Sequence, residues 1–132
     1  MDAMEGAGMI DAIFSNNIYV ATKKMLDVSS LRHEAIATNI ANIETPGYKR
    51  VDLPKSFSEQ FATQLKSGNA NEINVPKLAP DSEAQSSRMD GNNVDMDKEL
   101  LAMSSNSMQY DTLTEFASNS LKQLKMAITG QV

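Results

Sequence analysis

Residues 96–128 read MDKELLAMSSNSMQYDTLTEFASNSLKQLKMAI and carry the most regular apolar pattern in the chain. Steps of four and three residues alternate through this stretch. Eight of the ten positions on these steps are apolar or aromatic, the full set being Met96, Leu100, Met103, Ser107, Tyr110, Thr114, Ala117, Leu121, Leu124 and Ile128. This spacing predicts a long helix with a coiled-coil seam, which begins near Asp95 and stops at Gly130. Such a seam needs a partner surface.

The N-terminal third supplies the predicted partner helix. Residues 1–8 lack periodicity and are predicted to be a mobile leader. From Met9 the apolar residues return at helical spacing, with Ile18, Met25 and Val28 on the seam. We favour one helix, although the pair Ser29-Ser30 leaves a bend or break open. The sequence therefore predicts an all-α fold in which residues 9–45 and 94–129 pair as a two-helix coiled coil in a single domain.

The intervening residues 46–93 are predicted to form a central insert. Pro46-Gly47 fits the middle of a type II turn, because glycine accepts the positive φ that this turn requires. A short amphipathic helix is expected near 57–66. Residues 66–93 are rich in Asn, Ser, Asp, Glu and Pro, which predicts a flexible or disordered loop, with room for a short extended piece around 72–76.

Composition excludes several classes of function. The net charge of −5 is spread along 132 residues, without the basic stripe that nucleic acid or an anionic membrane selects. There is no cysteine, so disulfides and thiolate metal sites are excluded. The N-terminus lacks the basic and apolar regions of a secretory signal, and no apolar run is long enough to span a bilayer.

Two features of the sequence carry side chains that could take part in chemistry. The run from Asp90 to Glu99 has oxygen ligands, but it lacks the glycine and the carboxylate that a calcium-binding EF-hand loop needs at its sixth and twelfth positions. His33 is the only histidine and has no recognisable nucleophile or acid partner. We therefore predict no catalytic residue, no metal, no cofactor and no small-molecule substrate.

Asn39 and Asn42 lie one helical turn apart beside an apolar stripe, where asparagine is unfavourable. In one interpretation they only terminate the helix. In the other, their amides form hydrogen bonds across a helix–helix contact and fix its register. The sequence leaves both open.

Two motifs carry a resemblance to a known family. The string from Asn39 to Arg50, NIANIETPGYKR, resembles the N-terminal signature of rod, hook and related axial proteins of the bacterial flagellum. The run DGNNVDMDKE from Asp90 to Glu99, followed by Asn106 and Tyr110, resembles the proximal rod proteins of that group. Together they make up 24 of the 132 residues, and the predicted helices around them extend the resemblance to most of the chain. The residues that match are Asn39, Ala41, Asn42, Thr45, Pro46, Gly47, Tyr48, Gly91, Asn92, Val94, Asp95, Glu99, Asn106 and Tyr110.

The resemblance implies a structural subunit of the flagellar basal body rod in the periplasm. Such subunits leave the cell through the flagellar type III export apparatus without a cleaved signal. The implied partners are copies of the chain, other rod proteins, the inner-membrane ring and the export gate. The alternatives are a cytoplasmic helical adaptor or chaperone, or another rod subunit of the same family.

Overall fold

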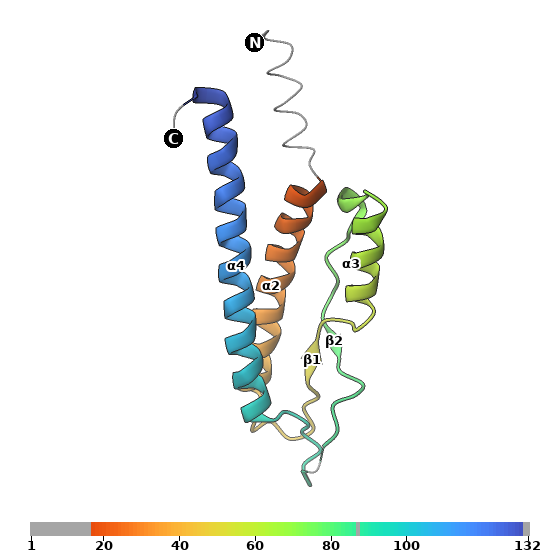
Figure 1. Ribbon diagram of the computed structural model, residues 1–132. Coiled ribbons are helices and arrows are strands. Elements are labelled where there is room, and N and C mark those ends of the chain that lie inside the picture. Colours follow the sequence, from red (N-terminus) through yellow and green to blue (C-terminus); the bar gives the residue numbers. More distant parts are fainter. Residues whose placement is uncertain (1–16, 87, 131–132) are drawn as a thin grey trace.

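The computed structural model describes residues 17–86 and 88–130, and the predicted leader and the first turns of the N-terminal helix lie outside them. In chain order the elements are α2 (Asn17–Ala41), β1 (Val51–Asp52), α3 (Phe57–Lys66), the 3-10 turn η1 (Ala70–Glu72), β2 (Ala79–Pro80) and α4 (Met96–Thr129). In Figure 1, α4 runs beside α2, and the strands and α3 lie on the other side of α2. The described part is mostly helical, as predicted, whereas a coiled-coil pairing is not confirmed.

Helix α2 passes through Ser29-Ser30 without interruption, so the predicted alternative of a break there is wrong. The hydroxyl of Ser29 donates to the side chain of Asn106 on α4, over 3.1 Å. Helix α2 ends at Ala41, and the turn that follows has Gly47 at a φ of 73° with a 3.2 Å hydrogen bond from the Tyr48 amide to the Thr45 carbonyl. These are features of the predicted type II turn.

Both ends of α4 confirm the boundaries that the sequence predicts. The side chain of Asp95 caps the first turn and accepts from the amides of Asp97 and Lys98 at 3.0 and 3.3 Å. At the other end Gly130 takes the left-handed conformation, with a φ of 66°, and its amide donates to the Met126 carbonyl. The predicted short helix at 57–66 is also confirmed, as α3.

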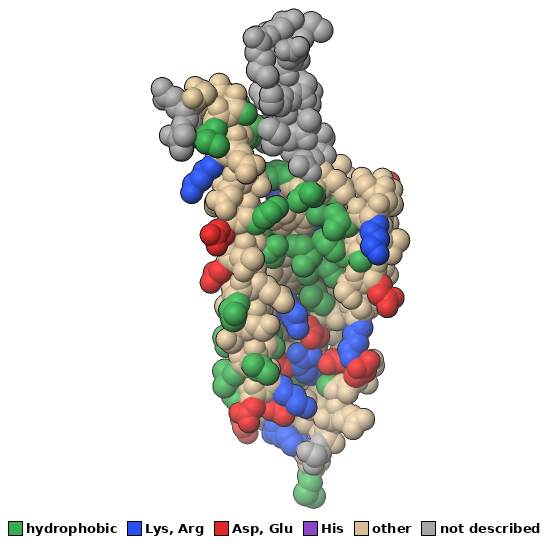
Figure 2. All heavy atoms as spheres, viewed as in Figure 1, with side chains coloured by type: hydrophobic (Ala, Val, Ile, Leu, Met, Phe, Trp, Pro, Cys, Tyr) green, Lys and Arg blue, Asp and Glu red, His purple; other side chains and the backbone are tan. Residues whose placement is uncertain are grey.

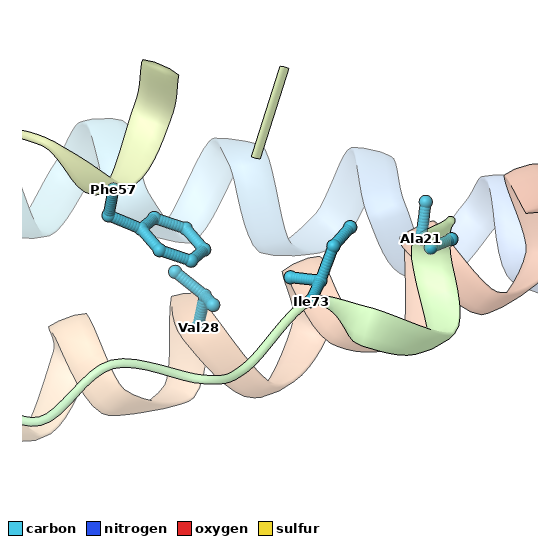
Figure 3. Packing of buried hydrophobic residues seen from close by; sticks show 5 residues of the cluster. Ala21, Val28, Phe57 and Ile73 are labelled. Carbon is cyan, nitrogen blue, oxygen red and sulfur yellow. The ribbon is translucent and has the colours of Figure 1, made fainter. Parts of the chain in front are cut away.

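The apolar core joins α2 to the insert rather than to α4. Its buried members are Ala21, Val28, Phe57, Ala70 and Ile73. Figure 3 shows Phe57 and Ile73 pointing toward α2. Each large side chain buried here contributes about 1.5–3 kcal/mol. Residues 66–93 are predicted to be a flexible or disordered loop, but their described part holds the end of α3, a 3-10 turn and β2. Ala70 and Ile73 of this segment reach the core, which its composition does not predict.

A two-residue strand pair is the departure from the predicted all-α fold. Strands β1 and β2 are antiparallel, with Val51 opposite Pro80 and Asp52 opposite Ala79. Around 72–76, where a short extended piece is expected, Glu72 ends the 3-10 turn and Ile73 has an extended backbone, but the strand itself begins only at Ala79. The pair matters because it brings Asp81, just after β2, beside Arg50.

The face that α4 buries coincides with only part of the predicted apolar seam. Its buried residues are Glu99, Asn106 and Leu124. On the predicted seam Leu124 is buried and Met103 and Ala117 are half-buried, but Met96, Leu100, Tyr110, Leu121 and Ile128 are exposed. On α2, Val28 is buried and Met25 half-buried, whereas Ile18 is exposed. Polar contacts explain this orientation of α4. Glu99 and Asn106 both have buried partners, and satisfying them places most of the apolar seam toward solvent.

We expect Asn106→Ala to lower the free energy of unfolding by about 1–3 kcal/mol, because the change leaves buried groups of Ser29 unpaired. The Asn106 amide donates to the Ser29 carbonyl over 2.9 Å. Urea unfolding followed by circular dichroism measures the change. Asn119→Ala, at an exposed position of the same helix, is the control and should shift stability by no more than about 0.5 kcal/mol. Equal shifts in both variants would show that the polar contact does not hold α4 to α2.

Candidate functional site

A polar junction lies where α2 ends and α4 begins, at the lower end of these two helices in Figure 1. We define it by Asn39, Tyr48, Arg50, Asn92 and Glu99 with their direct partners, and Asn39 is at its centre. Its side chain is fully buried. The amide nitrogen donates to the Val51 carbonyl over 2.8 Å, and the amide oxygen accepts from the Val51 amide over 2.9 Å, so the side chain pairs with β1 as a neighbouring strand would. Tyr48 Oη also donates to that oxygen, over 3.0 Å, and Glu99 of α4 lies 3.5 Å from the amide nitrogen.

The two asparagines therefore have different roles. Asn39 reaches across to β1 and to α4, as the cross-contact interpretation requires. Asn42 stays local: its amide donates to the Thr38 carbonyl over 2.8 Å and its oxygen accepts from the Thr45 hydroxyl over 3.2 Å. That is the helix-terminating interpretation.

Asn92 joins the second motif to the first. It is also fully buried, and its amide nitrogen lies within 3.0 Å of the carbonyls of Asn42, Ile43 and Thr45. These carbonyls belong to the turns that follow α2, where the helix no longer supplies donors. Asn92 therefore closes the end of α2 with a side chain that is 50 residues away in sequence.

The loop before Asn92 is braced in the same way. Arg88 donates to the Ile43 carbonyl over 2.6 Å and pairs with Asp90 at 3.0 Å. The Gly47 amide donates to the Asp90 carbonyl over 2.8 Å. Gly91, at a φ of 79°, lies so close that an added Cβ would be 3.8 Å from the Gly47 Cα. The two glycines of the motifs thus meet, each with the positive φ that glycine accepts most readily.

Arg50 carries the charge at the junction. Its guanidinium contacts the buried carboxylate of Glu99 on α4, and it pairs with Asp52 at 2.8 Å and Asp81 at 2.9 Å. Its backbone amide donates to Asn93 Oδ1 over 2.6 Å. One side chain therefore ties the segment after α2 to both strands and to the first turn of α4.

The pKa values follow from this arrangement. Burial alone would lower the pKa of Arg50, but its hydrogen bonds to Glu99 and Asp52 outweigh burial and hold that pKa above the usual range. Burial would raise the pKa of Asp81, and the Glu83 amide together with Arg50 outweighs it and lowers that pKa. Burial, followed by the negative charge of Glu99, raises the pKa of the Tyr48 phenol. At neutral pH the junction therefore holds Arg50 charged, Asp81 ionised and Tyr48 as a proton donor.

The structure gathers most of the residues that the sequence motifs single out. Asn39, Tyr48, Asn92 and Glu99 bond to one another or to the adjoining backbone, and Val94 is buried beside them. Asp95 is the helix cap. Asn106 lies two turns further along α4, against Ser29, while Ala41 and Tyr110 are exposed.

Sequence reasoning missed four partners in this junction, namely Arg50, Asp52, Asp81 and Arg88. Arg50 closes the first motif, but nothing in its sequence neighbourhood marks it as buried. Asp81 and Arg88 lie in the segment predicted to be a flexible loop. The pairing of β1 with β2 is what brings Asp81 to Arg50. Strands of two residues are too short to be predicted from sequence, so this pairing could not be foreseen.

These groups bond to one another and to the surrounding backbone. Arg50 is the shared cation of three carboxylates, those of Asp52, Asp81 and Glu99. No group of three or more His, Asp or Glu side chains in residues 17–86 and 88–130 could hold a metal ion. His33 lies exposed on α2. In the same residues no helix is sufficiently long and apolar to cross a membrane. The fold and the junction define a helical structural protein whose long C-terminal helix is fixed at one end.

Comparisons with known proteins identify the family. No family model matches the chain. The flagellar basal body rod protein FlgB of Borrelia hermsii is 32% identical over 133 residues, which cover 88% of this chain and 98% of that protein. FlgB of Aquifex aeolicus is 32% identical, covering 87% and 93%, and FlgB of Bacillus subtilis is 28% identical, covering 90% and 98%. The chain belongs to the FlgB family of flagellar basal body rod proteins.

Family membership confirms the resemblance carried by the two motifs. The chain is a structural component of the basal body rod, and it interacts with other flagellar rod components. The residues of the polar junction are therefore those of a rod protein.

We expect Arg50→Met to destabilise the isolated chain by about 3–5 kcal/mol, because it leaves the carboxylate of Glu99 buried without its cation. The double variant Arg50→Met/Glu99→Leu should recover part of this loss. Urea unfolding measures both effects.

The control is Lys55→Met, which breaks an ion pair with Glu83 whose side chains are 59% and 70% exposed. We expect it to change stability by less than about 1 kcal/mol. If Arg50→Met cost no more than Lys55→Met, the junction would not be held by its buried charge.

Proposed function

We propose that the chain is a subunit of the proximal rod, exported through the flagellar type III apparatus, and that its terminal helices pack against neighbouring subunits and transmit torque. The observation that carries this proposal is the exposure of α4. Of its 34 residues only three are buried. Its exposed large apolar side chains include Leu100, Leu101, Met108, Tyr110, Phe116, Leu121 and Ile128. So much apolar surface on one helix is typical of a protein that is completed by partners.

Assembly would supply what the single chain lacks. Each large apolar side chain covered by a neighbour contributes about 1.5–3 kcal/mol, which offsets the entropy lost when subunits associate. The junction around Arg50 holds the first turn of α4 in place before assembly. Beyond Asn106 the helix buries a single residue, Leu124, within the described chain, and this is compatible with a loosely folded state during export.

The proposed partners are copies of the chain and other rod proteins along the sides, with the inner-membrane ring and the export gate at the proximal end. The proposed location is the periplasmic rod, reached without a cleaved signal. Torque would pass along the helix axes, and the polar contacts of Asn106 and Arg50 oppose sliding of α4 along α2.

A cytoplasmic helical adaptor or chaperone is the second candidate, because an exposed apolar helix can also hold one soluble partner. Cell fractionation separates the two functions. A rod subunit purifies with basal bodies, whereas an adaptor stays with the soluble proteins of the cell. Another position in the rod is the remaining alternative, and a cryo-EM map of the basal body decides it.

We expect Leu121→Glu to reduce incorporation into purified basal bodies at least about tenfold, with a matching loss of swimming, because it places a charge on a surface that assembly covers. Leu121 is 48% exposed in the single chain, so the circular dichroism spectrum of the Leu121→Glu variant should differ little from that of the unmodified protein. Asn119→Glu, an exposed polar position nearby, is the matched control. Equal incorporation of the two variants would contradict assembly through α4.

A further inference from the structure

An apolar groove runs between α3 and α4, with α2 as its floor. Met25 and Val28 line it from α2, and Phe57 and Phe61 line it from α3. Its volume is about 750 Å³. Figure 2 shows this recess as a cluster of hydrophobic side chains between the two outer columns of the molecule. On the α4 side, Leu101 and Met108 are 72% and 69% exposed, so nothing in the described chain fills the groove.

A second apolar surface lies on the other side of α4. It is the predicted seam, which we call the α4 stripe: the exposed residues Met96, Leu100, Tyr110, Leu121 and Ile128. At 3.6 residues per turn, the centre of this stripe and the groove-lining residues of α4 are separated by roughly 170° around the helix axis. The apolar ridge and the apolar groove therefore lie on nearly opposite sides of α4.

The charges near the two surfaces are complementary. Arg32 lines the groove, and its Nε atom is buried without a hydrogen-bond partner, the nearest carboxylate oxygen of Asp52 being 4.0 Å away. Asp111 lies at the edge of the α4 stripe beside Tyr110, is exposed, and makes no ion pair within the described residues. The Arg32 side chain as a whole is 38% exposed, so a ridge that enters the groove brings a carboxylate within reach of its guanidinium.

We propose that the groove receives the α4 stripe of a second copy of this chain, with Asp111 of one copy placed near Arg32 of the next. This inference rests on the proposed function and adds to it the two surfaces through which neighbouring copies make contact. The contact is heterologous, since it joins two different surfaces. Because the two surfaces are separate and lie on opposite sides of α4, each added copy leaves one free groove and one free stripe. Such a contact builds a ring or a helical array rather than a closed pair.

Cysteine cross-linking tests the proposal directly, since the natural chain contains no cysteine. Met108→Cys places a thiol in the groove of one tagged copy. Leu100→Cys, Tyr110→Cys and Leu121→Cys, tested one at a time in a copy with a different tag, place a thiol at successive heights on the stripe. Both copies are expressed together, basal bodies are purified and oxidised, and the products are separated by mass under non-reducing conditions.

We expect a product of twice the chain mass that carries both tags, with one of the three stripe positions giving the highest yield. A dimer formed by a single variant, groove to groove or stripe to stripe, would overturn the heterologous contact. So would incorporation of both copies without any two-tag product. A product that joins Met108→Cys to a different rod protein would assign the groove to that partner, and it would refute the second copy while leaving the proposed function standing. Absence of both copies from basal bodies would refute the proposed function itself.

A matched pair of variants tests the proposed ion pair between Asp111 and Arg32. Asp111→Asn should reduce the yield of the two-tag product roughly two- to five-fold, as expected for loss of one partly exposed ion pair. Glu115→Gln removes an exposed acid one turn further along α4 and away from the stripe, and it should leave the yield unchanged. Equal yields in both variants would remove Asp111 from the contact.

Discussion

The ion pair between Arg50 and Glu99 is the contact on which the arrangement of the two long helices depends. Glu99 is fully buried in the first turn of α4, and Arg50 lies nine residues after the end of α2 at Ala41. A buried pair of this kind adds little net stability over an apolar pair, because removing both charges from water is costly. Its effect is on specificity: any rotation of α4 that separated the charges would leave a carboxylate buried alone. Asp52, Asp81 and Asn39 complete the coordination of this pair and so tie the insert to the same point.

The outward direction of the apolar seam follows from that constraint. If α4 turned its seam toward α2, it would bury more apolar surface, but Glu99 and Asn106 would lose their partners. The polar contacts decide the orientation, and the apolar core is built instead between α2, α3 and the insert. The result is a chain with a covered core at one side and an uncovered helix at the other, as suits a subunit whose surroundings are other subunits.

The helices, their ends and the turn at Gly47 could be predicted from sequence, because periodicity, caps and glycine act locally. The direction in which α4 faces could not, since the seam from Met96 to Ile128 has the spacing of an internal contact. Its true orientation depends on Arg50, a residue 49 positions from its partner. Asn39 is singled out by its unfavourable place in a helix as well as by resemblance, and Asn92 and Glu99 by resemblance alone, whereas Asp81 and Arg88 lie in a polar segment whose composition predicts disorder. Long-range polar pairing leaves no local pattern.

Amide hydrogen exchange, compared between the isolated chain and purified basal bodies, tests the central claim most directly, namely that neighbours cover what the chain leaves open. In the isolated chain we expect slow exchange in residues 92–106, where α4 is held by Arg50 and Ser29, and fast exchange in 113–129. In the basal body both segments should exchange slowly. If residues 113–129 were already as protected in the isolated chain as residues 92–106, the covering of α4 would not come from assembly.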